Sequence, residues 1–270
     1  MKKSIVISTS STKFSALVFK ENLKESIKKV VNLGFDGAEL AVRNPKDLKV
    51  ENVIEIIKEN NLEVPAIGTG QAYGEEGLSF SDPDEVVRKT AVERIKDQII
   101  FASHFDAQVI IGLIRGKIEE SVNRAEAENW TIDCLRKCTE FAKEYNIRLT
   151  LEPVNRYESN FINTLNEGVE FIKRVGASNL GLLADTFHMN IEEVSIYDSI
   201  VQAKDYITHV HFADSNRWAP GCGHLDFKEI IKTLKKINYQ GYVSAEILPL
   251  PDPDSCARLT AKTLDKLNIS

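Results

Sequence analysis

Apolar segments of strand length alternate with amphipathic segments of helix length along the chain, and this pair repeats about eight times. Short apolar runs rich in β-branched residues predict strands, and apolar residues spaced three and four apart predict helices. The expected strands cover residues 3–8, 35–42, 63–68, 107–114, 147–153, 180–185, 207–213 and 241–247. The expected helices lie near residues 22–33, 51–60, 83–104, 122–144, 165–175, 195–205, 226–237 and 254–267.

This alternation indicates a parallel sheet whose strands are connected by helices. Eight such units in 270 residues fit a closed (β/α)8 TIM barrel better than an open doubly wound sheet. No linker rich in proline, glycine or serine divides the chain, so we expect a single α/β domain over residues 1–270. Residues 68–84 and 215–227 are expected to form long loops on the face of the barrel where the strands end.

Four ionisable residues stand where the last four expected strands end. Glu152 follows IRLTL, and Asp185, His211 and Glu246 end the runs NLGLLAD, ITHVH and GYVSAE. They are separated by 33, 26 and 35 residues, each close to one strand plus one connecting helix. The carboxyl ends of the strands of a TIM barrel form one ring, where catalytic residues gather. One such residue alone is more simply a helix cap or a core residue, but four together predict a site for a hard divalent cation.

A cation at this site would polarise a substrate carbonyl and favour loss of a proton from the neighbouring carbon by stabilising an enediolate. Glu152 and Glu246 come from the fifth and eighth strands and would approach a substrate from opposite sides. One carboxylate could then remove a proton while the other returns one. A cation between two such carboxylates could catalyse the epimerisation of a ketose or the isomerisation of an aldose to a ketose.

Five further residues near the strand ends are candidates for substrate contacts: Glu158, His188, Arg217, Trp218 and Arg115. Arg217 could hold substrate oxygens through two parallel hydrogen bonds, and Arg115 could supply a second positive charge for a carboxylate. Each residue has a simpler alternative. These alternatives are solvation for Glu158 and Arg115, a backbone contact for His188, a surface ion pair for Arg217 and hydrophobic packing for Trp218.

The charge and composition of the chain exclude several classes of partner. A net charge of −6 and a pI near 5.5 argue against nucleic acid, which is bound through clustered Lys and Arg. No apolar run is long enough for a membrane span. The N-terminal MKKSIVISTSSTKF begins with two lysines, but its apolar stretch is too short for a signal peptide, so we expect a cytoplasmic protein. GTGQAYG fits neither a P-loop nor a dinucleotide-binding fingerprint, which favours a free sugar or sugar acid over a sugar phosphate as ligand.

The four cysteines are expected to be reduced and structural. Cys134 and Cys138 lie one helical turn apart, but no second Cys or His pair completes a zinc site. For His209 and His224, a structural role is favoured over a role in orienting a metal ligand. A homo-oligomer remains open, because apolar side chains on barrel helices often form subunit contacts.

The stretches LEPVNRYESNFINT, LLADTFHMNIEE, HVHFADSNRWAPGCGHLDF and SAEILP resemble the xylose-isomerase-like barrel superfamily. Within it they resemble the D-tagatose and D-psicose 3-epimerases, over essentially the whole chain and most densely between residues 151 and 249. The resemblance implies Mn²⁺, with Mg²⁺ or Co²⁺ as alternatives. It implies that the ion is held by Glu152, Asp185, His211 and Glu246, with the two glutamates as the acid/base pair. It also implies substrate contacts for Glu158, His188 and Arg217.

The loop sequences ISTSS, AIGTGQAY, VIIGLIRG and SNRWAPGCGH resemble more narrowly the 5-keto-L-gluconate epimerases of inositol breakdown. We therefore expect a metal-dependent epimerase that inverts the carbon next to a carbonyl, with the conversion of 5-keto-L-gluconate to D-tagaturonate favoured. The alternatives are 3-epimerisation of neutral D-tagatose, D-psicose or L-ribulose, and aldose–ketose isomerisation.

Two other classes that use such barrels are disfavoured. A nuclease of the abasic-site type needs more metal ligands on the first four strands, where Glu39 is the one candidate, and an acidic chain is poorly suited to grip DNA. A non-catalytic binding barrel would not need the complete set of four ligands.

Overall fold

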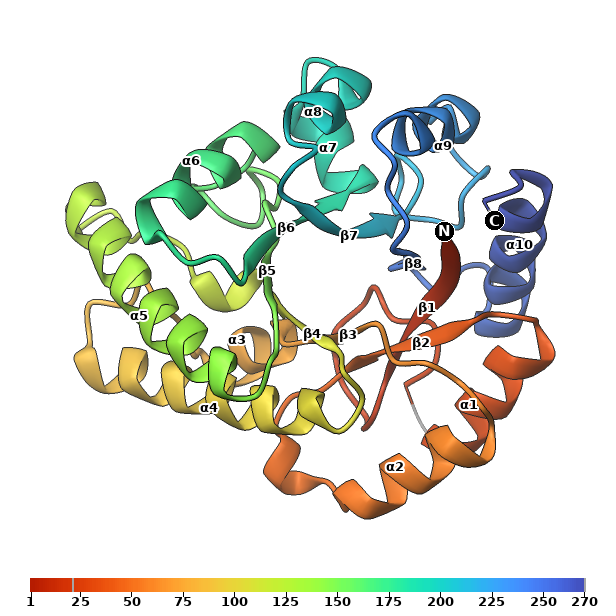
Figure 1. Ribbon diagram of the computed structural model, residues 1–270, viewed down its shortest axis with the longest axis horizontal. Helices are drawn as coiled ribbons and strands as arrows, with labels where there is room; N and C mark the ends of the chain where they lie inside the picture. The colour runs from red at the N-terminus through yellow and green to blue at the C-terminus, as the bar shows by residue number, and fades with distance from the viewer. Residues whose placement is uncertain (21, 270) are drawn as a thin grey trace.

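Eight parallel strands form a closed barrel at the centre of the molecule, which confirms the predicted TIM-barrel fold (Figure 1). The structure, a computed structural model, describes residues 1–20 and 22–269. The strands follow one another around the barrel in chain order: β1 (Lys2–Ser8), β2 (Gly37–Ala41), β3 (Ala66–Gly68), β4 (Gln108–Ile111), β5 (Leu149–Leu151), β6 (Leu180–Asp185), β7 (Ile207–Phe212) and β8 (Tyr242–Ala245). The barrel closes where β8 pairs with β1, with Ser4 opposite Ser244.

The helices surround the strands (Figure 1). In the described part of the chain they are α1 (Leu23–Asn32), α2 (Val50–Glu59), α3 (Gly70–Glu76), α4 (Glu85–Ser103), α5 (Arg124–Glu144), α6 (Leu165–Val175), α7 (Thr186–Glu192), α8 (Ile196–Gln202), α9 (Phe227–Lys236) and α10 (Pro253–Lys266). Two short 3₁₀ turns, Pro45–Asp47 and Leu113–Arg115, follow β2 and β4. None of these helices is long and apolar enough to cross a membrane.

Both faces of the strands are covered, and this explains their composition. Every residue of β2 (GAELA) and β6 (LGLLAD) is buried. A parallel sheet that is covered on both faces consists of nearly continuous apolar runs, so the few polar residues in these runs are conspicuous. Glu39 in β2 and His209 in β7 are at most 1% exposed and lie among apolar neighbours. The inside of the barrel therefore contains ionisable groups that need partners.

The structure corrects two details of the predicted elements. Several strands are shorter than expected, so Glu152 and Glu246 lie one residue beyond the ends of β5 and β8. The segment expected to be a loop between residues 68 and 84 contains helix α3, which ends at Gly77. Gly77 adopts a φ of 70°, in the left-handed region where glycine closes helices without strain. The strand ends still form one ring, as predicted, because the ring results from closure of the barrel and not from the length of each strand.

The cysteines are free thiols: Cys134, Cys138 and Cys256 are buried and Cys222 is half-buried. Burial raises the pKa of Cys134 to about 11 and raises the pKa of Cys138 well above its usual value. A thiol that stays protonated is a weak nucleophile and a weak metal ligand. The expected structural role of these two cysteines therefore agrees with their surroundings.

Candidate metal centre and active site

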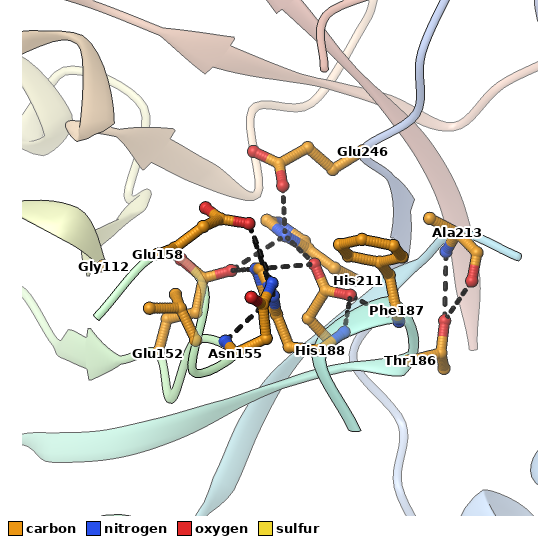
Figure 2. A network of polar contacts seen from close by, with 12 residues as sticks. Gly112, Glu152, Asn155, Glu158, Thr186, Phe187, His188, His211, Ala213 and Glu246 are labelled. Carbon is orange, nitrogen blue, oxygen red and sulfur yellow. Dashed lines mark hydrogen bonds and ion pairs between the residues drawn. The ribbon is translucent and has the colours of Figure 1, made fainter. Parts of the chain in front are cut away.

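The four residues at the ends of β5, β6, β7 and β8 converge on one point. Glu152, Asp185, His211 and Glu246 each contribute one ligand atom, and these atoms lie within 4.8 Å of one another. His211 Nδ1 lies 3.6 Å from Glu152 Oε1, 3.7 Å from Asp185 Oδ2 and 3.7 Å from Glu246 Oε2. Figure 2 shows Glu152 and Glu246 approaching His211 from different sides.

The donor set fits a hard divalent cation. Glu152 Oε1, Asp185 Oδ2 and His211 Nδ1 are buried and have no hydrogen-bond partner. Leaving a buried polar atom unpaired costs about 1–3 kcal/mol, and one cation would satisfy all three atoms. Ligand distances of about 2.0–2.6 Å place neighbouring ligand atoms roughly 3–3.7 Å apart, which matches the separations from His211. Three carboxylates and one imidazole could therefore hold such an ion.

Asp185 has two roles because its two oxygens face different partners. Oδ1 caps helix α7 by accepting the backbone N–H groups of Phe187, at 2.7 Å, and His188, at 3.3 Å. Oδ2 remains for the metal centre. The neighbouring Thr186 ties the end of β6 to β7, since its hydroxyl donates to the carbonyl of Ala213 and accepts from the N–H of the same residue (Figure 2). The start of α7 thus fixes the direction of the carboxylate.

Glu152 is buried and held in a tight space. A Cβ atom at position 112 would lie 2.3 Å from Glu152 Oε2, so only glycine leaves room for the carboxylate there (Figure 2). In the metal-free site, burial raises the pKa of Glu152 to about 7, and the carboxylates of Glu246 and Asp185 add to this effect. A carboxyl group with this pKa can exchange protons near neutral pH.

Glu39 joins the site from the opposite side of the barrel, and this was not predicted. Its Oε2 lies 2.7 Å from His209 Nε2, and its Oε1 lies 3.0 Å from His211 Nε2. An ionised carboxylate can only accept hydrogen bonds, so both imidazoles donate their Nε2–H to Glu39. The lone pair of neutral His211 is then on Nδ1 and faces the three site carboxylates. Glu39 therefore sets the tautomer that a metal ligand requires.

The charges around His211 determine how strongly its ring holds a second proton. Burial alone would lower the pKa of His211, but Glu39 and the three site carboxylates raise it well above its usual value. The pKa of Glu39 is held well below its usual value by His211 and His209, although burial acts in the opposite direction. A proton and a cation would therefore compete for His211 Nδ1. Glu39, His209 and His211 are also close enough to form a metal site, but their hydrogen bonds already satisfy one another.

Arg217 provides the positive charge of the site. It is 9% exposed, its guanidinium donates to Glu246 Oε2, and its Nη1 lies 3.6 Å from Glu158 Oε1. The guanidinium also lies over the ring of Phe187, 4.7 Å from its centroid. Arg217 adopts a φ of 60°, which is uncommon for a residue with a side chain and points to a position fixed by its surroundings.

The buried carboxylate of Asp214 shapes the loop that carries Arg217. Its oxygens accept the backbone N–H groups of Ser215 at 2.8 Å, Gly221 at 2.8 Å and Leu225 at 3.2 Å. Its backbone N–H donates to the carbonyl of Trp218. The predicted substrate contact of Trp218 finds no support here, because this side chain is half-buried and does not line the cavity at the metal centre.

Arg115 is not placed for the predicted contact with a substrate carboxylate. It is fully buried, and its guanidinium donates to the carbonyls of Gly112, Phe161 and Ile162. Ile162 has a φ of 59°, a strained value for a β-branched residue. Arg115 therefore ties the segment after β4 to the segment after β5. The expectation of a solvated or substrate-facing arginine is wrong, because carbonyl groups of two loops surround the guanidinium.

One cavity is lined by Glu152, His211 and Glu246 of the metal centre and by the predicted substrate contacts Glu158, His188 and Arg217. Its remaining walls are largely apolar and come from the segments after β1, β3 and β4, including Phe14, Leu17, Gly70, Gln71 and Leu113. Burial lowers the pKa of His188 to about 3, so this imidazole is neutral near pH 7. The cavity lining thus combines oxygen and nitrogen groups with hydrocarbon, which suits a polyhydroxylated chain with exposed C–H bonds.

Comparison with known proteins identifies the family. Residues 27–265 match the model of the xylose isomerase-like TIM barrel family. The chain is similar to a D-psicose 3-epimerase of Enterocloster bolteae, with 34% identity over 231 residues that cover 81% of this chain and 74% of the relative.

Two crystal structures extend this similarity. A 3-keto-D-glucoside 4-epimerase of E. coli has a TM-score of 0.84, 26% identity and coverage of 98% of this chain and 100% of the other. A D-psicose 3-epimerase in the presence of D-fructose has a TM-score of 0.85, 27% identity and full coverage of both chains. These matches confirm the predicted resemblance to the superfamily and to its ketose 3-epimerases.

Proposed function

We propose that this chain, which belongs to the xylose isomerase-like TIM barrel family and is an epimerase, uses a divalent cation to invert the carbon next to the carbonyl of a ketose or ketouronate. The observation that carries the proposal is the convergence of three carboxylates and one imidazole, with three unpaired buried ligand atoms, beside a cavity that Glu152, His211 and Glu246 line. Mn²⁺ is the proposed ion, in keeping with the resemblance to ketose 3-epimerases.

The cation, held by Glu152, Asp185, His211 and Glu246, would supply Lewis-acid polarisation of the substrate oxygens and so acidify the C–H bond between them. Glu152 and Glu246 come from β5 and β8, and each has an oxygen facing the same central point. One carboxylate removes the proton from one face of the substrate, and the other delivers a proton to the opposite face of the enediolate. Inversion follows because the two bases lie on different sides.

The other groups of the cavity hold the substrate. Arg217 fixes the Glu246 carboxylate through its guanidinium hydrogen bond. His188 and Glu158 lie beside the metal centre, 4.0 Å from Glu152 Oε1 and 3.6 Å from Arg217 Nη1, respectively. We propose that they bind the oxygen of the carbonyl carbon and the oxygen of the neighbouring carbon that is inverted. Burial of the whole set keeps water away from the enediolate.

The favoured substrate pair is 5-keto-L-gluconate and D-tagaturonate. The support is the likeness of the loop sequences to the ketouronate epimerases, together with Arg217, the one guanidinium or ammonium group among the described residues that line the cavity. Arg115 does not add a second positive charge to the cavity, so a substrate carboxylate has Arg217 and the cation as its only cationic partners within that lining.

Neutral ketoses are the second candidate, and the charge of the cavity favours them. Four carboxylates line it, those of Glu39, Glu152, Glu158 and Glu246, against the single guanidinium of Arg217. An anionic substrate would approach a surface that is mostly negative until the cation is bound. The similarity to a D-psicose 3-epimerase points the same way.

Proton NMR of the metal-loaded protein with 5-keto-L-gluconate, D-tagaturonate, D-tagatose, D-psicose and L-ribulose separates these candidates. A desolvated charged hydrogen bond contributes about 1.5–3 kcal/mol, so a carboxylate site should favour D-tagaturonate over D-tagatose by roughly one to two orders of magnitude in kcat/KM. Equal values, or a preference for D-tagatose, would leave a neutral-ketose 3-epimerase. No conversion of any of the five sugars would contradict the proposal as a whole.

A further inference from the structure

Asn155, in the segment between β5 and α6, contacts two side chains of the cavity at once. Its side-chain nitrogen lies 2.8 Å from His188 Nδ1 and 2.8 Å from Glu158 Oε1. Its backbone N–H also faces His188 Nδ1, at 3.2 Å. Figure 2 shows the three side chains together, with Asn155 beside His188 and below Glu158. Asn155 is 2% exposed, so these contacts are shielded from water.

The orientation of the Asn155 amide is determined by its neighbours. Its Oδ1 accepts the backbone N–H of Tyr157 at 3.0 Å, and a backbone N–H can only donate. The NH₂ group must therefore point the other way, toward His188 and Glu158. Its two hydrogens meet two acceptors, so each hydrogen of the amide has a partner.

The same contacts determine the tautomer of His188. Nδ1 receives a backbone N–H and an amide N–H, so it must carry the lone pair, and the ring proton is on Nε2. Nε2 lies 4.0 Å from Glu152 Oε1 and 3.9 Å from Asp185 Oδ2, beyond hydrogen-bond distance. Arg217 Nη1 lies 3.3 Å from Nε2 and can only donate, so it could bond to Nε2 only in the other tautomer. Two donors at Nδ1 thus compete with one donor at Nε2 for the single lone pair of the neutral ring, and the two at Nδ1 prevail. His188 thus has a donor at the metal centre without an acceptor of its own.

We propose that Asn155 is a positioning residue: it fixes the tautomer and direction of the His188 ring and the direction of the Glu158 carboxylate, so that His188 offers a hydrogen-bond donor and Glu158 an acceptor to the substrate. This inference rests on the proposed function. It adds which of the two groups donates a hydrogen bond to the substrate and which accepts one.

The isosteric change Asn155→Asp tests the proposal, since it replaces both amide donors by acceptors. A proton should move to His188 Nδ1, because a carboxylate attracts an N–H there. The Glu158 carboxylate should be repelled. We expect kcat/KM to fall by about 10- to 100-fold, the scale of one misplaced charged hydrogen bond. The affinity for Mn²⁺ should stay within about threefold of the wild type, as Asn155 contacts none of the four metal ligands.

Nitrogen-15 NMR determines the tautomer of His188 directly and does not require catalytic activity. The chain has only five histidines to assign. In the metal-free wild-type protein, His188 should show an unprotonated Nδ1 and a protonated Nε2. In Asn155→Asp, the Nδ1 signal should shift to a protonated value. A protonated Nδ1 in the wild type, or an unprotonated Nδ1 in the variant, would overturn the proposal even if the enzyme is active. Absence of epimerase activity would instead refute the proposed function and leave the tautomer result standing.

Asn163 offers a matched control in the same segment. Its amide donates to the carbonyls of Val154 and Ser159, at 2.7 and 2.8 Å, and does not contact His188 or Glu158. Asn163→Asp should leave the His188 tautomer unchanged and reduce kcat/KM less than Asn155→Asp does. An equal loss in both variants would show that only the fold of the segment matters. Should Asn155→Asp fail to fold, Asn155→Ser must still lower kcat/KM with unchanged Mn²⁺ affinity, and wild-type kcat/KM would refute the proposal.

Discussion

Replacing Glu39 by Gln should weaken metal binding, although Glu39 is not one of the four metal ligands. In the wild type, one carboxylate accepts the Nε2–H groups of both His209 and His211, at 2.7 and 3.0 Å. The amide of Gln has the same shape but only one oxygen. If that oxygen serves His209, the NH₂ group faces His211, whose ring proton must then move to Nδ1. The lone pair that faces the metal centre is lost.

The size of the effect follows from the hydrogen bonds involved. In Glu39→Gln, His211 can keep its metal-binding tautomer only without its charge-assisted hydrogen bond to the carboxylate of residue 39. The loss of such a bond costs about 1.5–3 kcal/mol. This corresponds to a rise of about 10- to 100-fold in the dissociation constant of Mn²⁺, the usual range for groups that orient a metal-binding histidine. The loss should also appear as a smaller stabilisation of the folded protein at a fixed Mn²⁺ concentration.

Titration calorimetry with Mn²⁺ measures both affinity and stoichiometry. Thr150→Val is the matched control, because it removes a part-buried hydrogen bond from Thr208 to Thr150 and neither histidine takes part in that bond. We expect one Mn²⁺ per chain, weaker binding in Glu39→Gln and wild-type binding in Thr150→Val. An unchanged dissociation constant in Glu39→Gln would refute the tautomer argument. Two bound ions per chain would show that Glu39, His209 and His211 form a second metal site.

Two further predictions concern the metal centre. Asp185→Asn keeps the cap of α7 through its remaining oxygen but loses the Oδ2 ligand. We therefore expect a protein that is folded by circular dichroism, binds little metal and has no turnover. Bound metal at wild-type levels would show that the ligand is misassigned. Metal affinity should fall with decreasing pH, because the raised pKa of metal-free His211 means that a proton must leave Nδ1 before a cation can bind. Above pH 7, log Kd for the metal should rise by about one for each pH unit of decrease, because one proton leaves His211 when the metal binds. Below pH 7 the rise should be steeper, because Glu152, with a pKa of about 7, also becomes protonated. Calorimetry between about pH 6 and 8 checks this, and a flat profile would contradict it.

The sequence was sufficient to predict the barrel and its four converging residues, because both depend on local patterns. Each of the four follows an apolar run, and the TIM barrel itself brings the ends of such runs into one ring. Errors of several residues in strand length did not matter, since Glu152 and Glu246 stay at the rim when β5 and β8 end one residue earlier than the side chains.

The partners of these residues could not be predicted in the same way. The contact between Glu39 and His211 joins residues 172 apart on β2 and β7, and no spacing in the chain encodes it. One signal was available, an ionisable residue within the apolar run GAELAV, and it identified Glu39 as a candidate ligand without indicating its partner. Asn155 had no such signal, because an asparagine after a strand is common in loops.

For Arg115, the sequence predicted a contact that the structure does not contain. A loop arginine near a predicted active site suggests a substrate contact, but the fold buries it among carbonyl groups of two segments. Whether an arginine meets backbone or ligand depends on how neighbouring loops close over it, and this is decided by tertiary packing.

Deuterium exchange tests the central claim most directly. The metal-loaded protein is incubated in D₂O with the ketose or ketouronate that it converts best, and the product is analysed by NMR. Proton removal by one glutamate and return by the other predicts deuterium at the inverted carbon and at no other carbon. Glu246→Gln should lower the rate by about 100-fold or more, because it removes one of the two bases while keeping the shape of the side chain. An inverted product without solvent deuterium, or full activity in Glu246→Gln, would contradict the two-base account.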